Sequence, residues 1–235
     1  MNDTSPKNNP ELLKLTAITL MTIDHLGFIF DDNVIMRSLG RLALPLFIIQ
    51  LIFGFYLTKN HYQSLKNLVT FAFISYLPYS IFLNNYYLFH LDEINKAQII
   101  WNIFLPLSIS YLCLMMIEIK NYAAVILLLA ISFNLDMDYY WYVPVMTCSL
   151  FYSNCNLNNR SSFFITLLIF ISINTIYCIV KDTNYIQLIA PLGVILAFIL
   201  LNIKINFRLP KYFYYWFYPC HLMLLVIIKV LYEYK

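Results

Sequence analysis

The sequence predicts an all-α, polytopic membrane protein. Of its 235 residues 61% are hydrophobic and only 11% are charged, which leaves too little polar surface for a water-soluble domain. Apolar stretches of about 18 residues or more, long enough to cross a bilayer, recur along the whole chain. Because the sequence shows no internal repeat and no low-complexity tract, we expect one integral membrane domain over residues 1–235.

Four membrane spans are expected in the first half of the chain. Asn9 is a favourable N-cap for the first span, and Pro10 and Glu11 suit its first turn. A tight polar turn at residues 31–33 precedes the second span, and a polar loop around His90 precedes the fourth. Windows of about 17–25 apolar residues place these spans at residues 11–30, 34–58, 65–84 and 97–117.

Five further spans are expected in the second half. The fifth and sixth are short, and Asp136 and Asp138 separate them. An Asn-rich loop at residues 153–162 leads to the seventh span, and a basic connection at residues 204–211 precedes the ninth. The five spans cover residues 122–135, 139–153, 163–180, 185–203 and 212–231.

Lysines and arginines predict the orientation, because short basic loops stay in the cytoplasm. With the N-terminus inside, the inner face collects Lys7, Lys14, Lys59, Lys66, Lys120, Arg160, Lys204, Arg208 and Lys211. The outer face then holds only Arg37, Lys96, Lys181, Lys229 and Lys235. We therefore expect a multi-pass protein of the bacterial inner (plasma) membrane with a cytoplasmic N-terminus, surrounded by lipid. Nucleic acid is not an expected partner, because the net charge is only +3 and forms no basic stripe.

Asp24 and His25 form an ionisable pair inside the first expected span. Such groups are costly at membrane depth unless neighbouring protein satisfies them, so they indicate a functional site. Lys14 precedes His25 by about three helical turns, which places both on one helix face about 16 Å apart. The first span therefore carries a cation and an imidazole on one face.

Arg41 is expected at the same depth as Asp24, about 10 Å below the outer surface. An arginine at this depth needs a partner, so we expect an ion pair between Asp24 and Arg41. Asp24 is then first a structural clamp and second a catalytic participant. His25, rotated by about 100° from Asp24, faces elsewhere and is free to meet a substrate. Arg37, one turn before Arg41, is expected on the exposed outer rim.

His221 follows Pro219 by two residues in the last expected span. A proline bends a helix and frees a backbone carbonyl, and broken helices often line sites in membrane proteins. Counting along the helices places His221 about 8 Å nearer the inner surface than His25. Two interpretations stay open, a site residue or a buried histidine hydrogen-bonded across helices. His61 and His90 fall in expected loops and are interpreted as solvated.

Five stretches occur together in this chain: LKLTAITLMTIDHLGFIF, RSLGRLALPLFIIQLIFGFYLTKN, ISYLPYSIF, WNIFLPL and YYWFYPCHLMLL. Their combination resembles the TraX family of bacterial membrane acetyltransferases, whose best known member N-acetylates the pilin of conjugative plasmids. Residues 117–209 resemble the family only in hydrophobicity and at Asp138 and Tyr139. The spacing of Lys14 and His25 also resembles the basic-x10-His signature of the larger membrane acyltransferase family that acetylates cell-surface sugars.

This resemblance implies an enzyme that moves an acetyl group from acetyl-CoA to an amine. The implied acceptor is the N-terminus of a pilin or of another small membrane or surface polypeptide. The first alternative is an O-acetyltransferase of a surface glycan. The second alternative is a transporter or a non-catalytic membrane scaffold. The chain departs from the family in one position, since Phe53 stands where the family's second helix carries a glutamate before its glycine, here Gly54.

Acetyl transfer from CoA needs a base near the acceptor proton and positive charge for the CoA phosphates. His25 is the candidate base, because an imidazole titrates near neutrality, and Asp24 and His221 complete the expected catalytic set. No metal is expected, because the cysteines and histidines show no metal-ligand spacing. The donor comes from the cytosol, and its candidate binding residues are Lys14, Arg41, Lys59, Lys66, Arg208 and Lys211.

Overall fold

The computed structural model describes residues 11–30, 32–84, 100–153, 160–181, 185–203, 208–210 and 212–233. Over these ranges all regular secondary structure is helical, apart from one isolated bridge between Trp101 and Met137. The predictions for His90, Lys204 and Lys211 lie outside the described residues.

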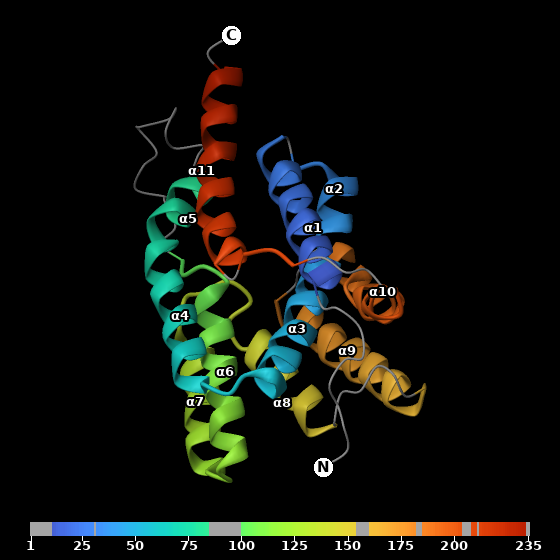
Figure 1. Ribbon diagram of the computed structural model, residues 1–235. Helices are drawn as coiled ribbons and strands as arrows, with labels where there is room; N and C mark the ends of the chain where they lie inside the picture. The colour runs from blue at the N-terminus through green and yellow to red at the C-terminus, as the bar shows by residue number, and fades with distance from the viewer. Residues whose placement is uncertain are drawn as a thin grey trace.

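The helices follow the expected spans in chain order (Figure 1). They are α1 (Glu11–Ile29), α2 (Val34–Gly40), α3 (Ala43–Leu57), α4 (His61–Ile74), α5 (Tyr76–Leu83), α6 (Phe104–Glu118), α7 (Tyr122–Asn134), α8 (Tyr142–Tyr152), α9 (Arg160–Lys181), the 3-10 helix η3 (Tyr185–Ile189), α10 (Leu192–Leu201) and α11 (Phe213–Glu233).

Prolines explain why several expected spans are divided. A proline in a helix leaves the carbonyl four residues earlier without its N–H donor and clashes with it. Pro45 does this to Arg41, where the break between α2 and α3 lies, and Pro78 does it to Ile74, next to the break between α4 and α5. The second and third expected spans therefore each consist of two helices.

The fourth expected span begins later than the sequence predicted. Residues 100–103 are not helical, and α6 starts only at Phe104. The side chain of Asn102 explains the start, because its Oδ1 accepts a hydrogen bond from the Phe104 N–H at 3.0 Å. Its amide also donates to the Ala72 carbonyl at 2.7 Å, which ties this segment to α4.

Within the described residues, four helical stretches are long and apolar enough to cross a membrane, namely Glu11–Ile29, Val34–Leu57, Ser161–Lys181 and Phe213–Tyr232. Large apolar side chains point outward from the shorter helices too, as Ile126 on α7 shows with an exposed fraction of 69%. Exposed apolar surface of this extent suits contact with lipid. The chain is thus a helical membrane protein, while the count of nine spans, the single domain and the orientation stay predictions.

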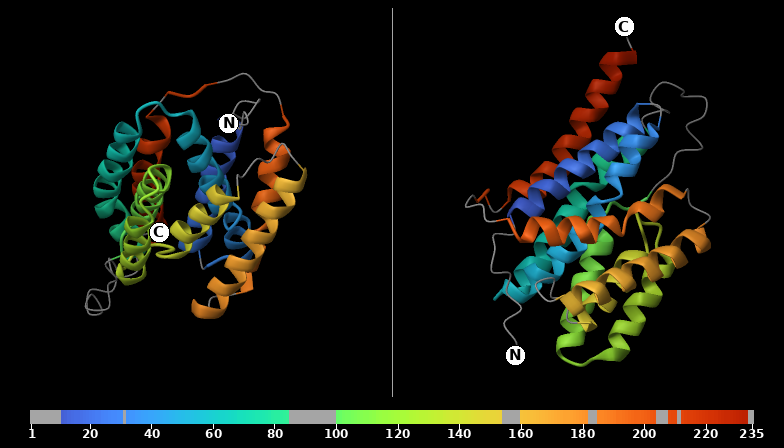
Figure 2. Two further views of the ribbon diagram at one scale, coloured as in Figure 1. Left: turned by 90° about the horizontal axis from the view of Figure 1, so that it is seen from below. Right: turned by 90° about the vertical axis from the view of Figure 1, so that its right-hand side faces the viewer.

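The two helices that carry the candidate catalytic residues Asp24, His25 and His221 pack against each other. Helix α1 contacts α2, α3 and α11, and α11 in turn contacts α5. Figure 1 shows α1 and α11 side by side, both running toward the end where the C-terminus lies. Figure 2 shows α9 and α10 next to each other on the side of the molecule away from α4 and α5.

Candidate functional site

Helices α1 and α11 bring His25 and His221 into direct contact. The Nδ1 atom of His25 lies 2.8 Å from the Nε2 atom of His221, and the two rings are nearly parallel, with an interplanar angle of 9°. His221 is buried, with an exposed fraction of 6%. The two side chains thus meet, while the expected depth difference of about 8 Å between the residues stays a prediction.

The hydrogen bonds of this histidine pair assign the proton positions. The Nδ1 atom of His221 lies 2.9 Å from the Phe217 carbonyl, which only accepts, so this Nδ1 carries a proton. A neutral His221 then accepts at Nε2 the proton that His25 donates from Nδ1. Two charged rings would instead place two N–H donors against each other. The Nε2 atom of a neutral His25 is therefore left with a free lone pair.

His25 lines a cavity of about 400 Å³, which is named the outer cavity after the orientation that the sequence predicts. No hydrogen-bond partner of His25 Nε2 occurs in the part of the chain that the structure describes. The ring of Phe82 lies 4.9 Å from the His25 ring and holds it from the side of α5. The polar and aromatic lining of the outer cavity includes Asp24, Arg37, Arg41, Tyr79, Asp138, Tyr139, Tyr140, Tyr177, Lys181 and Tyr218. The histidine pair thus presents a candidate base to an open space.

Asp24 faces away from His25, as predicted, and contacts two arginines. Arg41 Nη2 lies 3.7 Å from Asp24 Oδ1, so the expected partner is present. The nearer partner is Arg37, whose Nη1 lies 2.8 Å from Asp24 Oδ2 and whose Nε lies 3.1 Å from Asp32 Oδ1. The prediction that Arg37 is an exposed rim residue was wrong, since only 19% of its side chain is exposed.

Two glycines explain why Arg37 reaches Asp24. A Cβ atom at Gly40 would collide with the Asp24 side chain, and one at Gly27 would lie 2.7 Å from the Cβ of Met36. The absence of these Cβ atoms lets α1 and α2 approach closely, as small residues commonly do between membrane helices. The carboxylate of Asp24 therefore lies within ion-pair distance of α2.

The connection between α7 and α8 forms another wall of the outer cavity. Its position is fixed by two backbone hydrogen bonds, from the Trp101 N–H to the Asp136 carbonyl at 2.9 Å and from the Asp138 N–H to the Trp101 carbonyl at 2.8 Å. Tyr139 has a φ of 52°, a left-handed conformation that is uncommon for tyrosine. Its hydroxyl accepts a hydrogen bond from Arg41 Nη1 at 2.6 Å. Sequence analysis treated Asp138 only as a loop residue, although its match to the family pattern was a signal.

A second cavity of about 410 Å³, called the inner cavity below, adjoins the first. Four residues, Met21, Phe47, Ile103 and Tyr218, line both cavities and form the boundary between them. Tyr218 is also a neighbour of His25, with ring centroids 6.3 Å apart. The candidate base therefore lies close to the place where the two cavities meet.

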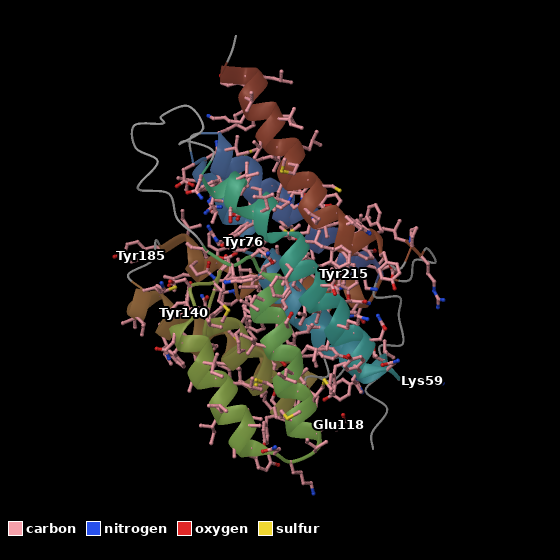
Figure 3. All side chains as sticks on the ribbon, turned by 90° about the vertical axis from the view of Figure 1, so that its left-hand side faces the viewer. Lys59, Tyr76, Glu118, Tyr140, Tyr185 and Tyr215 are labelled. Carbon is pink, nitrogen blue, oxygen red and sulfur yellow. The ribbon has the colours of Figure 1, made fainter. Side chains whose placement is uncertain are left out.

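Lys14 lines the inner cavity, whereas Arg41 lines the outer one. Lys14 Nζ lies 2.8 Å from Glu11 Oε1, and the Tyr214 hydroxyl donates to Glu11 Oε2 at 2.7 Å. Lys59 follows Thr58, a residue of the inner-cavity wall, and is exposed. In Figure 3 Lys59 lies on the opposite side of the molecule from Tyr140, which lines the outer cavity. The candidate donor-binding residues Lys66 and Arg208 are exposed as well.

His61 differs from its predicted place in a solvated loop. It begins α4, and its Nδ1 lies 2.9 Å from the Tyr111 hydroxyl, while its ring lies 4.3 Å from that of Phe55. The prediction was wrong because the helix starts four residues before the expected span and turns His61 toward α6. Since Tyr111 lines the inner cavity, His61 supports that wall from behind.

Comparison with protein families matches residues 9–229 to the model described as TraX protein. The chain belongs to the TraX family. The "Probable fimbrial assembly protein FimC, serogroup H1" of Dichelobacter nodosus is 30% identical over 113 residues, which are 44% of each chain. An uncharacterized protein of Rickettsia prowazekii (strain Madrid E) is 42% identical over 50 residues, 21% of this chain and 20% of that protein. The chain thus matches less than half the length of either relative, and no solved structure matches it.

The departure of this TraX-family chain from the family pattern lies in the inner cavity. Phe53, which replaces the expected glutamate, is buried with an exposed fraction of 4% and lines that cavity. Gln50, one turn earlier on α3, lines it too. Its Oε1 is enclosed, and the described residues offer it no hydrogen-bond partner. At the position of the expected acid this wall thus carries an apolar ring, and the nearest polar side chain that α3 contributes to the wall is the amide of Gln50.

Proposed function

We propose that this TraX-family chain is an acetyltransferase of the bacterial inner membrane. It moves an acetyl group from cytosolic acetyl-CoA to an amine on the outer side, such as the N-terminus of a pilin. The observation that carries the proposal is the histidine pair, which leaves Nε2 of His25 free beside the boundary of two adjoining cavities. The similarity to a probable fimbrial assembly protein supports a pilin-like acceptor.

The inner cavity is the proposed site of the donor. Its walls are mostly apolar and aromatic with a few polar groups, including Gln50, Ser64 and Asn67, which is the usual character of a small-molecule site. The pantetheine arm of CoA has amide groups that such side chains bind. The CoA phosphates would remain at the mouth, where Lys14, Lys59, Lys66 and Arg208 supply positive charge on the side assigned to the cytoplasm.

The outer cavity is the proposed site of the acceptor, and His25 is the proposed base. The amine nitrogen attacks the thioester carbonyl carbon, so that an N–C bond forms and the C–S bond breaks. Nε2 of His25 takes the amine proton and returns it to the leaving thiolate, which departs as the CoA thiol. His221 orients the ring of His25 and shares the charge that develops on it, as the third group of a catalytic triad does. Asp24 holds Arg37 and Arg41 in the wall.

The test uses the purified chain with radiolabelled acetyl-CoA and two peptides that differ only in a free or a blocked N-terminus. We expect label on the free peptide alone, and we expect His25→Ala to abolish it. His61→Ala is the comparison variant: because this histidine contacts Tyr111 in the donor-cavity wall instead of the pair, it should at most weaken acetyl-CoA binding and should retain labelling at saturating acetyl-CoA. Label on hydroxyl groups of a glycan would support the alternative O-acetyltransferase. Uptake of acetyl-CoA into vesicles without covalent label would contradict acetyl transfer and indicate a transporter.

A further inference from the structure

Asp138 is a carboxylate of the outer cavity that the proposed chemistry does not yet use. It is half-buried and lines the cavity wall opposite α2. No lysine, arginine or histidine nitrogen of the described chain lies within 4.0 Å of it. A carboxylate that is partly withdrawn from water without an ion pair is costly, so its presence calls for a partner.

The arginines of the cavity are already occupied by other groups. Arg37 contacts both Asp24 and Asp32, at 2.8 Å and 3.1 Å. Arg41 contacts Asp24 at 3.7 Å and donates to the Tyr139 hydroxyl at 2.6 Å. Arg41 thus reaches the α7–α8 connection through Tyr139, and both guanidinium groups attract the Asp138 carboxylate without an ion pair to it. The Asp138 side chain lines the open space, with the Tyr79 hydroxyl as its hydrogen-bond partner among the described residues.

The backbone around Asp138 fixes where its carboxylate lies. The Asp138 N–H donates to the Trp101 carbonyl at 2.8 Å, and the next residue, Tyr139, adopts the left-handed conformation with a φ of 52°. The buried Tyr79 hydroxyl lies beside the carboxylate and interacts with it. A residue held in an uncommon conformation by surrounding contacts is typical of a binding wall. Asp138 is therefore preorganised toward the cavity.

The aromatic residues of the outer cavity suit a positive charge. Ring faces attract cations, and an ammonium group within about 6 Å of a ring centroid is stabilised. The cavity already shows one such contact, because Lys181 Nζ lies 4.3 Å from the centroid of the Tyr140 ring. The other aromatic residues of the lining are Phe28, Phe47, Tyr79, Phe82, Tyr139, Tyr177 and Tyr218.

The geometry points to Asp138 as the residue that binds the ammonium group of the acceptor. The carboxylate pairs with the charge, and the aromatic lining surrounds the carbon atoms next to it. The bound ammonium then loses one proton to solvent and reacts as the amine. This inference rests on the proposed function for the identity of the ligand as an acceptor, but binding of the ammonium group itself needs no acetyl transfer. An alcohol can donate a hydrogen bond to the carboxylate but brings no counter-charge, so Asp138 selects amines over hydroxyl compounds.

The test measures equilibrium binding of two probes to the purified full chain by calorimetry. The probes are phenylalaninamide and phenyllactamide, which differ only in an ammonium or a hydroxyl group. The measurement is made at about pH 7, because burial raises the pKa of Asp138 to about 6 and the ordinary pKa of an α-amino group is about 7.7–8.0. A charge-assisted hydrogen bond corresponds to a factor of roughly ten or more in affinity, so we expect the wild type to prefer phenylalaninamide by at least that factor.

Asp138→Asn should remove this preference, so that both probes bind about equally, whereas Asp138→Glu should retain part of it. Asp136→Asn is the matched control, because this neighbouring aspartate is exposed and contributes only its backbone carbonyl to Trp101. Unchanged binding of phenyllactamide to all variants confirms that the cavity is intact. A wild type without preference, or an Asp138→Asn variant that keeps it, would overturn the inference.

Failure of this inference is distinguishable from failure of the proposed function. If the wild type prefers the ammonium probe through Asp138 but transfers no acetyl group, Asp138 is an ammonium-binding residue and the proposed acetyltransferase function is wrong. If acetyl transfer to an N-terminal amine shows the same KM with Asp138→Asn as with the wild type, the enzyme stands and the assignment of Asp138 fails.

Discussion

His25 and His221 lie 196 residues apart in the sequence, yet Nδ1 of His25 and Nε2 of His221 are 2.8 Å apart. The second histidine is itself anchored to the Phe217 carbonyl at 2.9 Å. These two contacts determine which ring nitrogens carry a proton, namely Nδ1 of His25 and Nδ1 of His221. Nε2 of His25 is left with a free lone pair. The pair therefore joins two helices and sets the protonation pattern of a candidate base at the same time.

The role of His221 as an orienting group is testable with two substitutions. A glutamine oxygen can still accept a hydrogen bond from Nδ1 of His25, whereas leucine cannot. We expect His221→Gln to retain part of the acetyl-transfer rate and His221→Leu to lose about 10²–10⁴-fold in kcat, the usual effect of a misplaced general base. Initial rates with labelled acetyl-CoA measure both. Equal rates for the two variants would show that the contact does not orient the base.

The close approach of α1 and α2 predicts a position-specific effect of an added methyl group. Gly40→Ala should overlap the Asp24 side chain and lower the free energy of unfolding by about 1–3 kcal/mol. Gly54→Ala is the matched control, because an added Cβ there meets open space, and alanine favours a helix. Thermal unfolding of the detergent-solubilised proteins measures the difference. Equal loss of stability in both variants would contradict the close packing at Gly40.

Asp24 is predicted to be a structural clamp before it is a catalytic group. Asp24→Asn removes the partly buried carboxylate that Arg37 and Arg41 share, and removing one partner of a buried ion pair typically costs about 3–5 kcal/mol. Because these side chains are still 15–19% exposed, we expect a value at or below the lower end of that range. The folded fraction should retain most of its kcat. An Asp24→Asn variant that is as stable as the wild type but transfers no acetyl group would instead assign Asp24 a catalytic role.

Much of this site followed from the sequence, because helical geometry is local. A rotation of about 100° per residue correctly separated the directions of Asp24 and His25, and equal depth correctly placed Arg41 near Asp24. The apolar windows and polar turns also placed helical structure in each expected span. The start of α6 was expected too early, because hydrophobicity alone did not reveal that Asn102 holds residues 102–104 in a turn before the helix.

The rest depended on packing between helices, which periodicity does not determine. The contact of His25 with His221 depends on helix tilt, and the burial of Arg37 depends on the close approach that Gly40 permits. Asp138 lies in a connection, so no helical pattern assigned it a direction. Its position results from the backbone bridge to Trp101, a contact between segments far apart in the chain.

The boundary between the two cavities predicts where a bulky residue blocks transfer. Ile103→Trp should narrow the boundary that Ile103 shares with Met21, Phe47 and Tyr218. We expect kcat to fall at least about tenfold while acetyl-CoA still binds, because only passage to the acceptor is blocked. Ile126→Trp on the exposed face of α7 is the control and should leave both unchanged. A loss of acetyl-CoA affinity in Ile103→Trp that parallels its loss of kcat would contradict separate donor and acceptor cavities.

Transfer across the membrane in one defined direction tests the central claim most directly. Oriented proteoliposomes are given labelled acetyl-CoA only on the side of Lys14 and an N-terminally free peptide only on the side of Asp32. The account predicts labelled peptide with the wild-type chain and at least about a 10²-fold smaller rate with His25→Ala. No label with the wild type, or an equal rate with His25→Ala, would contradict the assignment of His25 as a base between the two cavities.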